Sequence, residues 1–354
     1  MKGAQSMKKE LLELSALGGI SGFESTAVPK VKELLLRYCD EVSSDRLGSI
    51  VGVRSCGRRN AKRVMLEAHI DGIGLMIKDI DERGFLSFTN IGGVDTRILP
   101  SAEVIVCGKK ELYGVIGAKP PHLQKPGESD KPALISDMAI DVGLPAEEVR
   151  KWITPGDMVT FCGGAKKLSS KVISGKYLDD RAGLLSLLLC LDELKNTRLD
   201  FDLVVLAAVQ EEVGCRGAAA GTQNIAPSAA FVVDVCHGDT PDSGTESIFK
   251  LGSGTVVSLG PNIHPYLSAL ALETAQAENI KHSVDVDGGE TGTDAWEVQV
   301  SGDGVPTLLL SIPLRYMHTT VETLHYDDVA ATGKLLAAAL QKLDLEALSC
   351  YYQI

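Results

Sequence analysis

Apolar residues recur along the chain with two spacings, one typical of helices and one of strands. Residues 7–17 and 28–38 carry apolar stripes with the spacing of amphipathic helices. Residues 63–69, 202–209 and 229–235 are short and almost wholly apolar, as are strands buried on both faces of a parallel sheet. The alternation continues with helices expected at 181–195, 265–279 and 327–343 and strands at 281–287 and 305–313. It predicts an α/β fold, a mixed, mainly parallel sheet with helices on both faces.

The pattern changes between residues 71 and 165, where apolar segments are short and alternate with polar residues. Glycine and proline separate these segments, which is typical of a small antiparallel β domain. Residues 118–132 contain four prolines, so we expect an exposed loop there. We interpret 1–70 and 166–354 as one α/β domain and 71–165 as a β-rich insertion. Its strand edges are expected to pair with other chains.

Composition and charge narrow the class of protein. The 354 residues include 47 Asp and Glu against 35 Lys and Arg, a net charge of −12. This balance argues against a nucleic-acid or anionic-membrane partner, because both require a basic surface. No apolar run approaches the ~20 residues that cross a bilayer, and we expect no signal peptide. The eight cysteines include no CxxC pair, so we interpret them as small buried side chains. We therefore expect a cytoplasmic globular protein.

Acidic and histidine side chains interrupt the predicted strands near their carboxyl ends, and one acidic pair precedes the helix at 181–195. The side chains concerned are His69, Asp71, Asp179, Glu211, Glu212, Asp234 and His318. In an open parallel sheet, the carboxyl ends of neighbouring strands meet at one edge, where ligands bind. Histidines with carboxylates and no cysteine suit Zn²⁺, Co²⁺ or Mn²⁺. A carboxylate between two such ions can bridge them at ~3.5–4 Å.

Each of these residues also has a purely structural interpretation. His69 alone is more simply a hydrogen-bonded core histidine, and Asp179 with Asp180 fits the N-terminal cap of the next helix. Residues 211–212 fit a solvated turn. Asp234 is harder to explain in this way, because an unpaired carboxylate in a buried strand is costly. Taken together, five such interruptions at the ends of α/β elements favour a site.

Seven motifs follow one another along the chain. They are AHIDGIG (68–74), GVIGAKPPH (114–122), KYLDDRAG (176–183), QEEVGCRGA (210–218), FVVDVCHGD (231–239), GTDAW (292–296) and RYMHTTVE (315–322). Together they resemble the M42 family of metallo-aminopeptidases, which includes glutamyl, leucyl and deblocking aminopeptidases and the tetrahedral TET assemblies. The resemblance covers essentially the whole chain and departs at Thr320, where the family pattern has proline. It implies a fold like that of the zinc exopeptidases.

The resemblance implies two divalent metal ions per subunit, Zn²⁺ or Co²⁺, with Mn²⁺ as a further option. The implied ligands are His69, Asp179 and Asp234 for one ion and Asp179, Glu212 and His318 for the other. Asp179 would bridge the ions, while the allocation of Glu212 and Asp234 stays open. Glu211 would be the general base, and Asp71 would orient His69 or a neighbouring group.

The implied activity is that of an aminopeptidase, which removes N-terminal residues from short peptides through a metal-bridging water and a glutamate base. The α/β domain would be catalytic, and 71–165 would mediate dimers and often closed twelve-subunit shells. A related di-zinc carboxypeptidase or deacylase is the alternative, because a metal core does not determine which end of the substrate binds. An endoglucanase ranks lower, since a glycosidase needs two carboxylates and neither histidine nor metal. A non-catalytic assembly protein would not need the base Glu211.

Overall fold

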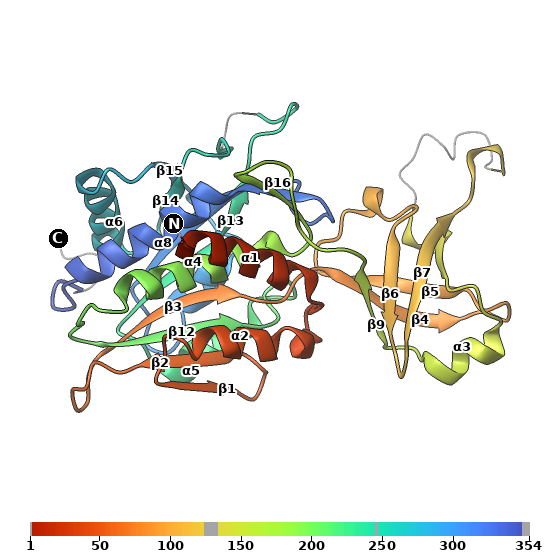
Figure 1. Cartoon of the computed structure of the whole chain (residues 1–354), viewed down its shortest axis with the longest axis horizontal. Helices are drawn as coiled ribbons and strands as arrows, with labels where there is room; N and C mark the ends of the chain where they lie inside the picture. The colour runs from red at the N-terminus through yellow and green to blue at the C-terminus, as the bar shows by residue number, and fades with distance from the viewer. Residues whose placement is uncertain (1, 124–133, 245–246, 349–354) are drawn as a thin grey trace.

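The computed structural model describes residues 2–123, 134–244 and 247–348. These residues form an eleven-stranded open sheet with helices and a closed β-barrel. Figure 1 shows the two units side by side along the longest axis of the molecule, with the barrel at the right. None of the helices in the described ranges is long and apolar enough to cross a membrane.

The open sheet has the order β1-β2-β12-β3-β13-β16-β17-β11-β10, and β14 and β15 extend from β16. Its strands are β1 (Glu41–Ser44), β2 (Ile50–Arg54), β3 (Arg63–His69), β10 (Lys166–Lys167), β11 (Val172–Gly175), β12 (Asp202–Ala208), β13 (Ala229–His237), β14 (Thr255–Leu259), β15 (His282–Val286), β16 (Thr307–Arg315) and β17 (Glu322–His325). The helices of this unit are α1 (Lys2–Ala16), α2 (Val28–Leu35), α4 (Leu178–Leu194), α5 (Arg216–Ile225), α6 (Pro265–Ala277), α7 (Asp294–Gln299) and α8 (Tyr326–Lys342).

The centre of the sheet is parallel and its periphery is largely antiparallel. Strands β12, β3, β13 and β16 run parallel to one another, and β14 is parallel to β15. Strand β2 is antiparallel to β12, and β17 is antiparallel to β16. The predicted α/β class with a mixed sheet is confirmed. The short outer strands were not predicted, because they contain too few apolar residues to show a period.

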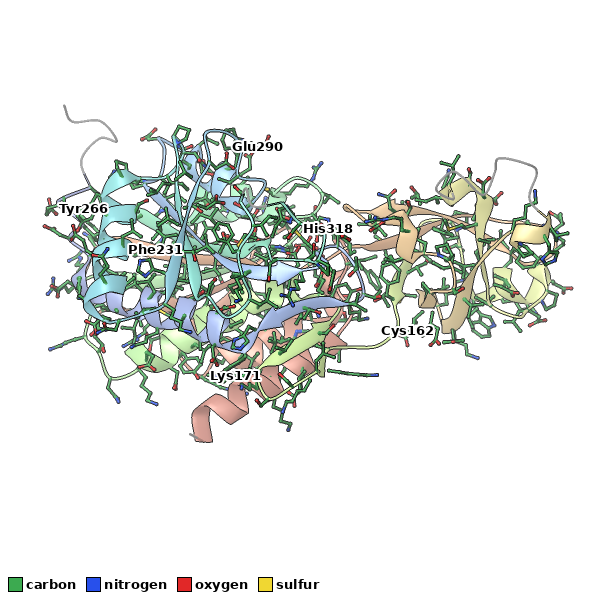
Figure 2. The ribbon with its side chains drawn as sticks, turned by 90° about the horizontal axis from the view of Figure 1, so that it is seen from above. Cys162, Lys171, Phe231, Tyr266, Glu290 and His318 are labelled. Carbon is green, nitrogen blue, oxygen red and sulfur yellow. The ribbon has the colours of Figure 1, made fainter. Side chains whose placement is uncertain are left out.

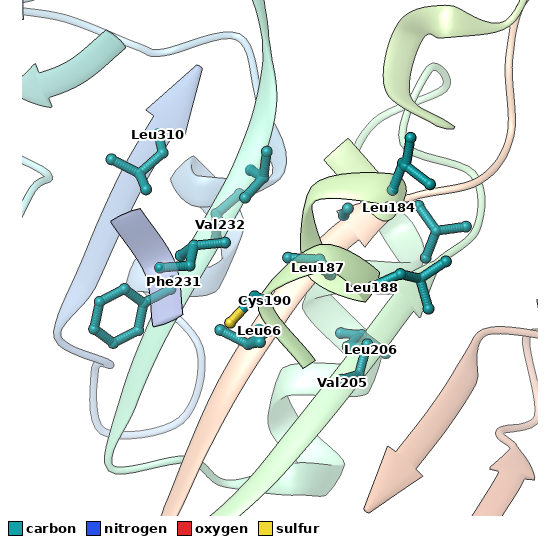
Figure 3. Packing of buried hydrophobic residues seen from close by; sticks show 14 of the residues in the cluster. Leu66, Leu184, Leu187, Leu188, Cys190, Val205, Leu206, Phe231, Val232 and Leu310 are labelled. Atoms are coloured by element: carbon teal, nitrogen blue, oxygen red, sulfur yellow. The ribbon is translucent and has the colours of Figure 1, made fainter. Parts of the chain in front are cut away.

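The central strands are buried because they are almost wholly apolar. Val64, Met65 and Leu66 of β3 are inaccessible to solvent. Helix α4 packs on β3 and β13 and against α8, and Figure 3 shows Leu187 and Leu188 of α4 beside this layer. Each such side chain stabilises the fold by about 1.5–3 kcal/mol on burial. The ends of the central strands are therefore held on a rigid platform.

The barrel is formed between residues 74 and 161. Its strands are β4 (Gly74–Ile80), β5 (Leu86–Ile91), β6 (Glu103–Cys107), β7 (Glu111–Ala118), β8 (Met138–Asp141) and β9 (Met158–Phe161), with helix α3 (Ala146–Trp152) beside them. Neighbouring strands are antiparallel, and β4 closes the barrel on β9. Alternate side chains point inward, so Val104 and Val106 are buried in a hydrophobic core separate from that of the α/β unit.

The closure of the barrel contradicts the expectation that its strands have free edges. Free strand edges were expected, but each barrel strand is paired on both sides, so the edges that other chains could extend are absent from the described barrel. The outward side chains of β7 are a different kind of surface, with Tyr113 and Val115 exposed by 55% and 40%. The loop predicted at 118–132 lies largely outside the described residues.

Candidate metal centre

The site residues predicted from the sequence meet at the carboxyl ends of the central strands. Strand β3 ends at His69, β13 contains Asp234, and β12 and β16 lead to residues 211–212 and His318. Asp179 comes from the first turn of α4, where the backbone departs from helical angles. Figure 2 shows His318 on the side of the α/β unit that faces the barrel. Segments far apart in the sequence are thus brought to one place.

Asp179 lies between the two histidines. Its Oδ1 is 3.2 Å from Nε2 of His69, and its Oδ2 is 3.5 Å from Nε2 of His318. Oε2 of Glu212 is 3.4 Å from the same nitrogen of His318. Oδ1 of Asp234 is 4.0 Å from Nε2 of His69. One carboxylate therefore faces both sides of the cluster, as a bridging group would.

Potential ligand atoms within 4.8 Å of one another form two adjoining groups, His69–Asp180–Asp234 and Asp179–Glu212–His318. The second group is the set expected for one ion. In the first group, Asp180 occurs where Asp179 was expected. Oδ1 of Asp180 accepts the N–H of Gly183 at 2.9 Å, so the capping interpretation also describes this residue. No hydrogen bond within the described chain reaches its buried Oδ2.

Burial and mutual repulsion disfavour the charged carboxylates of these groups. Burial and neighbouring acidic groups raise the pKa of Glu212 and Asp234 well above the usual range. Burial lowers the pKa of His69, but Asp179 and Asp71 raise it well above 6.5 overall. Among the described residues, no lysine or arginine forms an ion pair with these carboxylates. A divalent cation would relieve the repulsion and replace the histidine protons, so the donor set fits metal ions.

Asp71 connects the cluster to the main chain. Its Oδ1 accepts the N–H of Glu211 at 3.0 Å, and its Oδ2 accepts from Ser21 Oγ at 2.6 Å and from the N–H of Glu212 at 3.3 Å. Its Oδ1 is also 3.5 Å from Nδ1 of His69. Burial raises the pKa of Asp71, but the contact with His69 and the charge of that ring, followed by the hydrogen bonds from Ser21 and the N–H of Glu211, lower it overall. Asp71 is thus placed to orient His69 and the segment 211–212.

Glu211 lies beside the two ligand groups. Its Oε2 is 4.0 Å from Nε2 of His69, and its Oε1 accepts a weak hydrogen bond from Cys215 Sγ at 3.5 Å. Burial raises the pKa of Glu211 to about 7, with an opposing contribution from His69 and a further increase from Asp294. A carboxyl group in this range can both accept and return a proton near neutral pH.

The structure adds an acidic residue to which the sequence analysis gave no role, Glu322. Its Oε2 accepts the N–H groups of Leu178 at 2.8 Å and Asp179 at 3.2 Å, and its Oε1 accepts the N–H of His318 at 3.2 Å. One buried carboxylate therefore fixes the main chain at two predicted ligands. Its position as the last residue of RYMHTTVE was the signal available in the sequence.

Two further acidic residues, Glu67 and Asp294, are buried next to each other, and Asp294 lies beside Glu211. They are at most 1% exposed. Burial raises the pKa of both, that of Asp294 to about 6. Asp294 also forms a third group of potential ligand atoms with Glu211 and Cys215. Glu67 was visible in the sequence as a carboxylate within an apolar strand, and Asp294 as the acidic residue of GTDAW.

The barrel contributes to the wall of the cluster through Gly93, in the segment that follows β5. The carbonyl oxygen of Gly93 is 3.1 Å from Nδ1 of His318. A Cβ on Gly93 would lie 2.6 Å from that nitrogen, so a larger residue would displace the histidine. The sequence contained no signal for this contact, because paired glycines are typical of any turn.

A cavity of about 610 Å³ opens onto the cluster, which is within the range of about 300–1,000 Å³ found for ligand pockets. The five predicted ligands and Glu211 line it, whereas Asp180 does not. An α/β sheet with adjoining histidine–carboxylate groups at its strand ends, a neighbouring glutamate and an open cavity has the features of a metal-dependent hydrolase.

Comparison with known proteins agrees with this class. The family model for M42 glutamyl aminopeptidases matches residues 48–335. The lysyl aminopeptidase of Pyrococcus furiosus is 35% identical over 92% of this chain and 94% of its own length. An aminopeptidase of the archaeon Desulfurococcus kamchatkensis superposes with a TM-score of 0.89 at 32% identity and covers 97% of both chains. The TET1 peptidase of Pyrococcus horikoshii, which assembles into a tetrahedron or an octahedral shell, has a TM-score of 0.82 at 31% identity over 94% of this chain and 98% of its own.

The chain belongs to the M42 family of aminopeptidases, and the protein is a peptide hydrolase. The family prediction is confirmed. The family model and the relatives from Pyrococcus furiosus and Desulfurococcus kamchatkensis are named as aminopeptidases, so the carboxypeptidase, deacylase and endoglucanase alternatives are not favoured.

Proposed function

We propose that the protein binds two divalent metal ions, Zn²⁺ or Co²⁺, and removes N-terminal residues from short peptides. The observation that carries this proposal is the placement of Asp179, which directs one carboxylate oxygen toward His69 and the other toward His318. Asp234 would complete the ligands of the ion at His69, and Glu212 those of the ion at His318. Asp180 lies beside His69 and Asp234 as a further potential donor.

Bound ions would polarise the scissile carbonyl and lower the pKa of a water molecule. Glu211 is a carboxyl group beside the proposed ligands, so it would accept the proton of that water and return it to the leaving amine. Asp71 would hold His69 and residues 211–212 in place through the contacts described above. Glu322 would do the same for Asp179 and His318, so the site is organised before substrate binds.

The relatives differ in the side chain that their names specify. One is a lysyl aminopeptidase, whereas the family description refers to glutamyl aminopeptidases. Membership of the family therefore supports the removal of N-terminal residues without specifying the preferred residue.

Metal depletion tests the proposal directly. Protein treated with EDTA and then dialysed should lose hydrolysis of aminoacyl-p-nitroanilides, and Co²⁺ or Zn²⁺ should restore it. Metal analysis of the restored protein should find two ions per chain. Full turnover by thoroughly metal-free protein would contradict the proposal, and so would restoration with a single ion per chain.

We also propose that residues 71–165 mediate self-association into dimers and a twelve-subunit shell. The assembly of the Pyrococcus horikoshii TET1 peptidase supports this, and Tyr113 with Val115 provides an exposed apolar face on the barrel. Light scattering should give a mass well above the 37.6 kDa of one chain. The pair Tyr113→Lys and Val115→Lys should lower it, whereas Leu36→Lys in the α/β unit should not. A monomeric wild type at micromolar concentration would contradict this proposal.

We propose a cytoplasmic location as well. The cysteines within the described ranges are all free, which is usual for proteins of a reducing compartment.

A further inference from the structure

The cavity at the candidate metal centre continues along one face of the sheet, away from the proposed ligands. Asp234 of β13 pairs with Ser311 of β16, and Ser258 of β14 pairs with Asp285 of β15. Directly opposed residues point to the same face of a sheet, and all four of these side chains line the cavity together with Asp287. The floor therefore runs from the metal centre over β16 and β14 to β15.

The far end of this floor is negatively charged. Asp285 is half-buried and Asp287 is exposed. Oδ1 of Asp285 accepts from Ser247 Oγ at 3.0 Å, and Oδ1 of Asp287 accepts the N–H of Gly289 at 2.9 Å. Within the described parts of the chain, no lysine or arginine lines the cavity. The two carboxylates therefore face the cavity without a cationic partner from these residues.

These two charges are not required by the proposed metal centre. Two divalent ions would bring four positive charges, and the three carboxylate ligands with Glu211 already supply four negative ones. Asp285 and Asp287 belong to neither of the ligand groups. Their negative charge would remain after the ions had bound, and it is available to a ligand of opposite charge.

We propose that this part of the cavity binds the side chain of an N-terminal lysine or arginine, with Asp285 and Asp287 as its counter-charges. The inference rests on the proposed function, because it assumes that the carbonyl of the N-terminal residue lies at the metal centre. Strand β15 is two strands beyond β16, roughly 10 Å at the usual spacing of about 4.8 Å. A long side chain is needed to span this distance. The aliphatic stem would lie over buried Leu309, and an acidic side chain would be repelled.

The test compares kcat/KM for p-nitroanilides of lysine, arginine, leucine and glutamate. The metal-loaded wild type should prefer lysine and arginine over leucine by about 10-fold or more, the scale of a charge pair formed in a partly desolvated pocket, and glutamate should be the poorest. Asp285→Asn and Asp287→Asn should each lower the ratio of lysine to leucine by several fold. Glu290→Gln is the matched control, since Glu290 follows Asp287 closely in the sequence but does not line the cavity. It should leave the ratio unchanged.

Three outcomes would overturn the inference. They are equal rates for lysine and leucine in the wild type, a preference for glutamate, and an Asp285→Asn variant that slows every substrate equally. The last result would indicate that Asp285 binds the α-amine, which all four substrates share. Calorimetry with lysinamide and norleucine amide measures binding at the proposed subsite without any turnover. If no substrate is hydrolysed but lysinamide still binds more tightly, the proposed function fails and the cationic subsite stands. Equal binding of the two amides would overturn the subsite itself.

Discussion

The α/β unit and the barrel bury different kinds of side chain. Every buried polar or charged side chain in the described ranges lies outside residues 74–161. The barrel interior is filled with residues such as Leu75, Val104 and Phe161, whereas the α/β unit buries His69 and Asp234 at its strand ends. Burying an ionisable group is costly unless a partner compensates for it. Within the described ranges, the chain therefore buries ionisable groups in the α/β unit alone, and a cation would compensate for those of the candidate site.

The architecture of the two sheets explains the difference. Closure of the barrel leaves its strands paired on both sides and its interior full. The open sheet ends in loops whose N–H groups can hold carboxylates, as Asp71 and Glu322 illustrate. The carboxyl ends of parallel strands therefore supply both the space and the hydrogen-bond donors for a charged site.

The largest expected effects come from two variants that distinguish metal binding from proton transfer. Asp179→Asn should lose bound metal and activity together, because the proposed bridge serves both ions. Glu211→Gln should lower kcat by about 10²-fold or more, the scale of a lost general base, while metal content stays near two ions per chain. Metal analysis and kinetics on the same samples make the comparison. Equal loss of metal in both variants would contradict the assigned roles.

A smaller effect would show that the barrel belongs to the site. Gly93→Ala places a Cβ 2.6 Å from Nδ1 of His318, so this ring must move. We expect metal affinity or kcat to fall by about 10-fold or more, as for the loss of an outer contact to a metal ligand. Gly117→Ala is the control, because its Cβ would have no neighbour closer than 3.9 Å. Unchanged metal affinity and kcat in Gly93→Ala would restrict the site to the α/β unit.

The two units also differ in how far the sequence predicted them. The central strands were predicted because the run around Val64 and Leu66 is continuous and apolar, and the predicted site residues lie where those strands end. The barrel was expected only as short antiparallel strands, since closure depends on the pairing of β4 with β9, more than 80 residues apart in the chain. Gly93 and Glu322 act through main-chain contacts with distant segments. Neither the spacing of apolar residues nor the type of a single residue predicts such contacts.

The smallest expected effect concerns the junction of the two units, where a lysine side chain is buried without an ion-pair partner among the described residues. Lys176, just after β11, donates to the carbonyl of Phe161 in β9 and to Thr160 Oγ1 at 3.3 Å. It is 5% exposed. Burial, with a further contribution from Arg181, lowers its pKa from 10.5 to about 8.

Between pH 8 and 10.5, folded Lys176 has lost its proton while the unfolded chain still holds it, so stability gained from this residue rises with pH. Below pH 8 both states are protonated and the full cost of the buried charge is present. The free energy of unfolding of the wild type, minus that of Lys176→Met, should therefore rise by about 2 kcal/mol between pH 7.5 and 10. Urea unfolding at each pH measures this difference, and the subtraction removes the opposing contribution of the buried cysteines, which both proteins share. Lys9→Met, on the exposed side of α1, controls for the loss of one positive charge. A difference that stays flat or falls over this range would show that the Lys176 side chain is solvated and that the junction buries no charge.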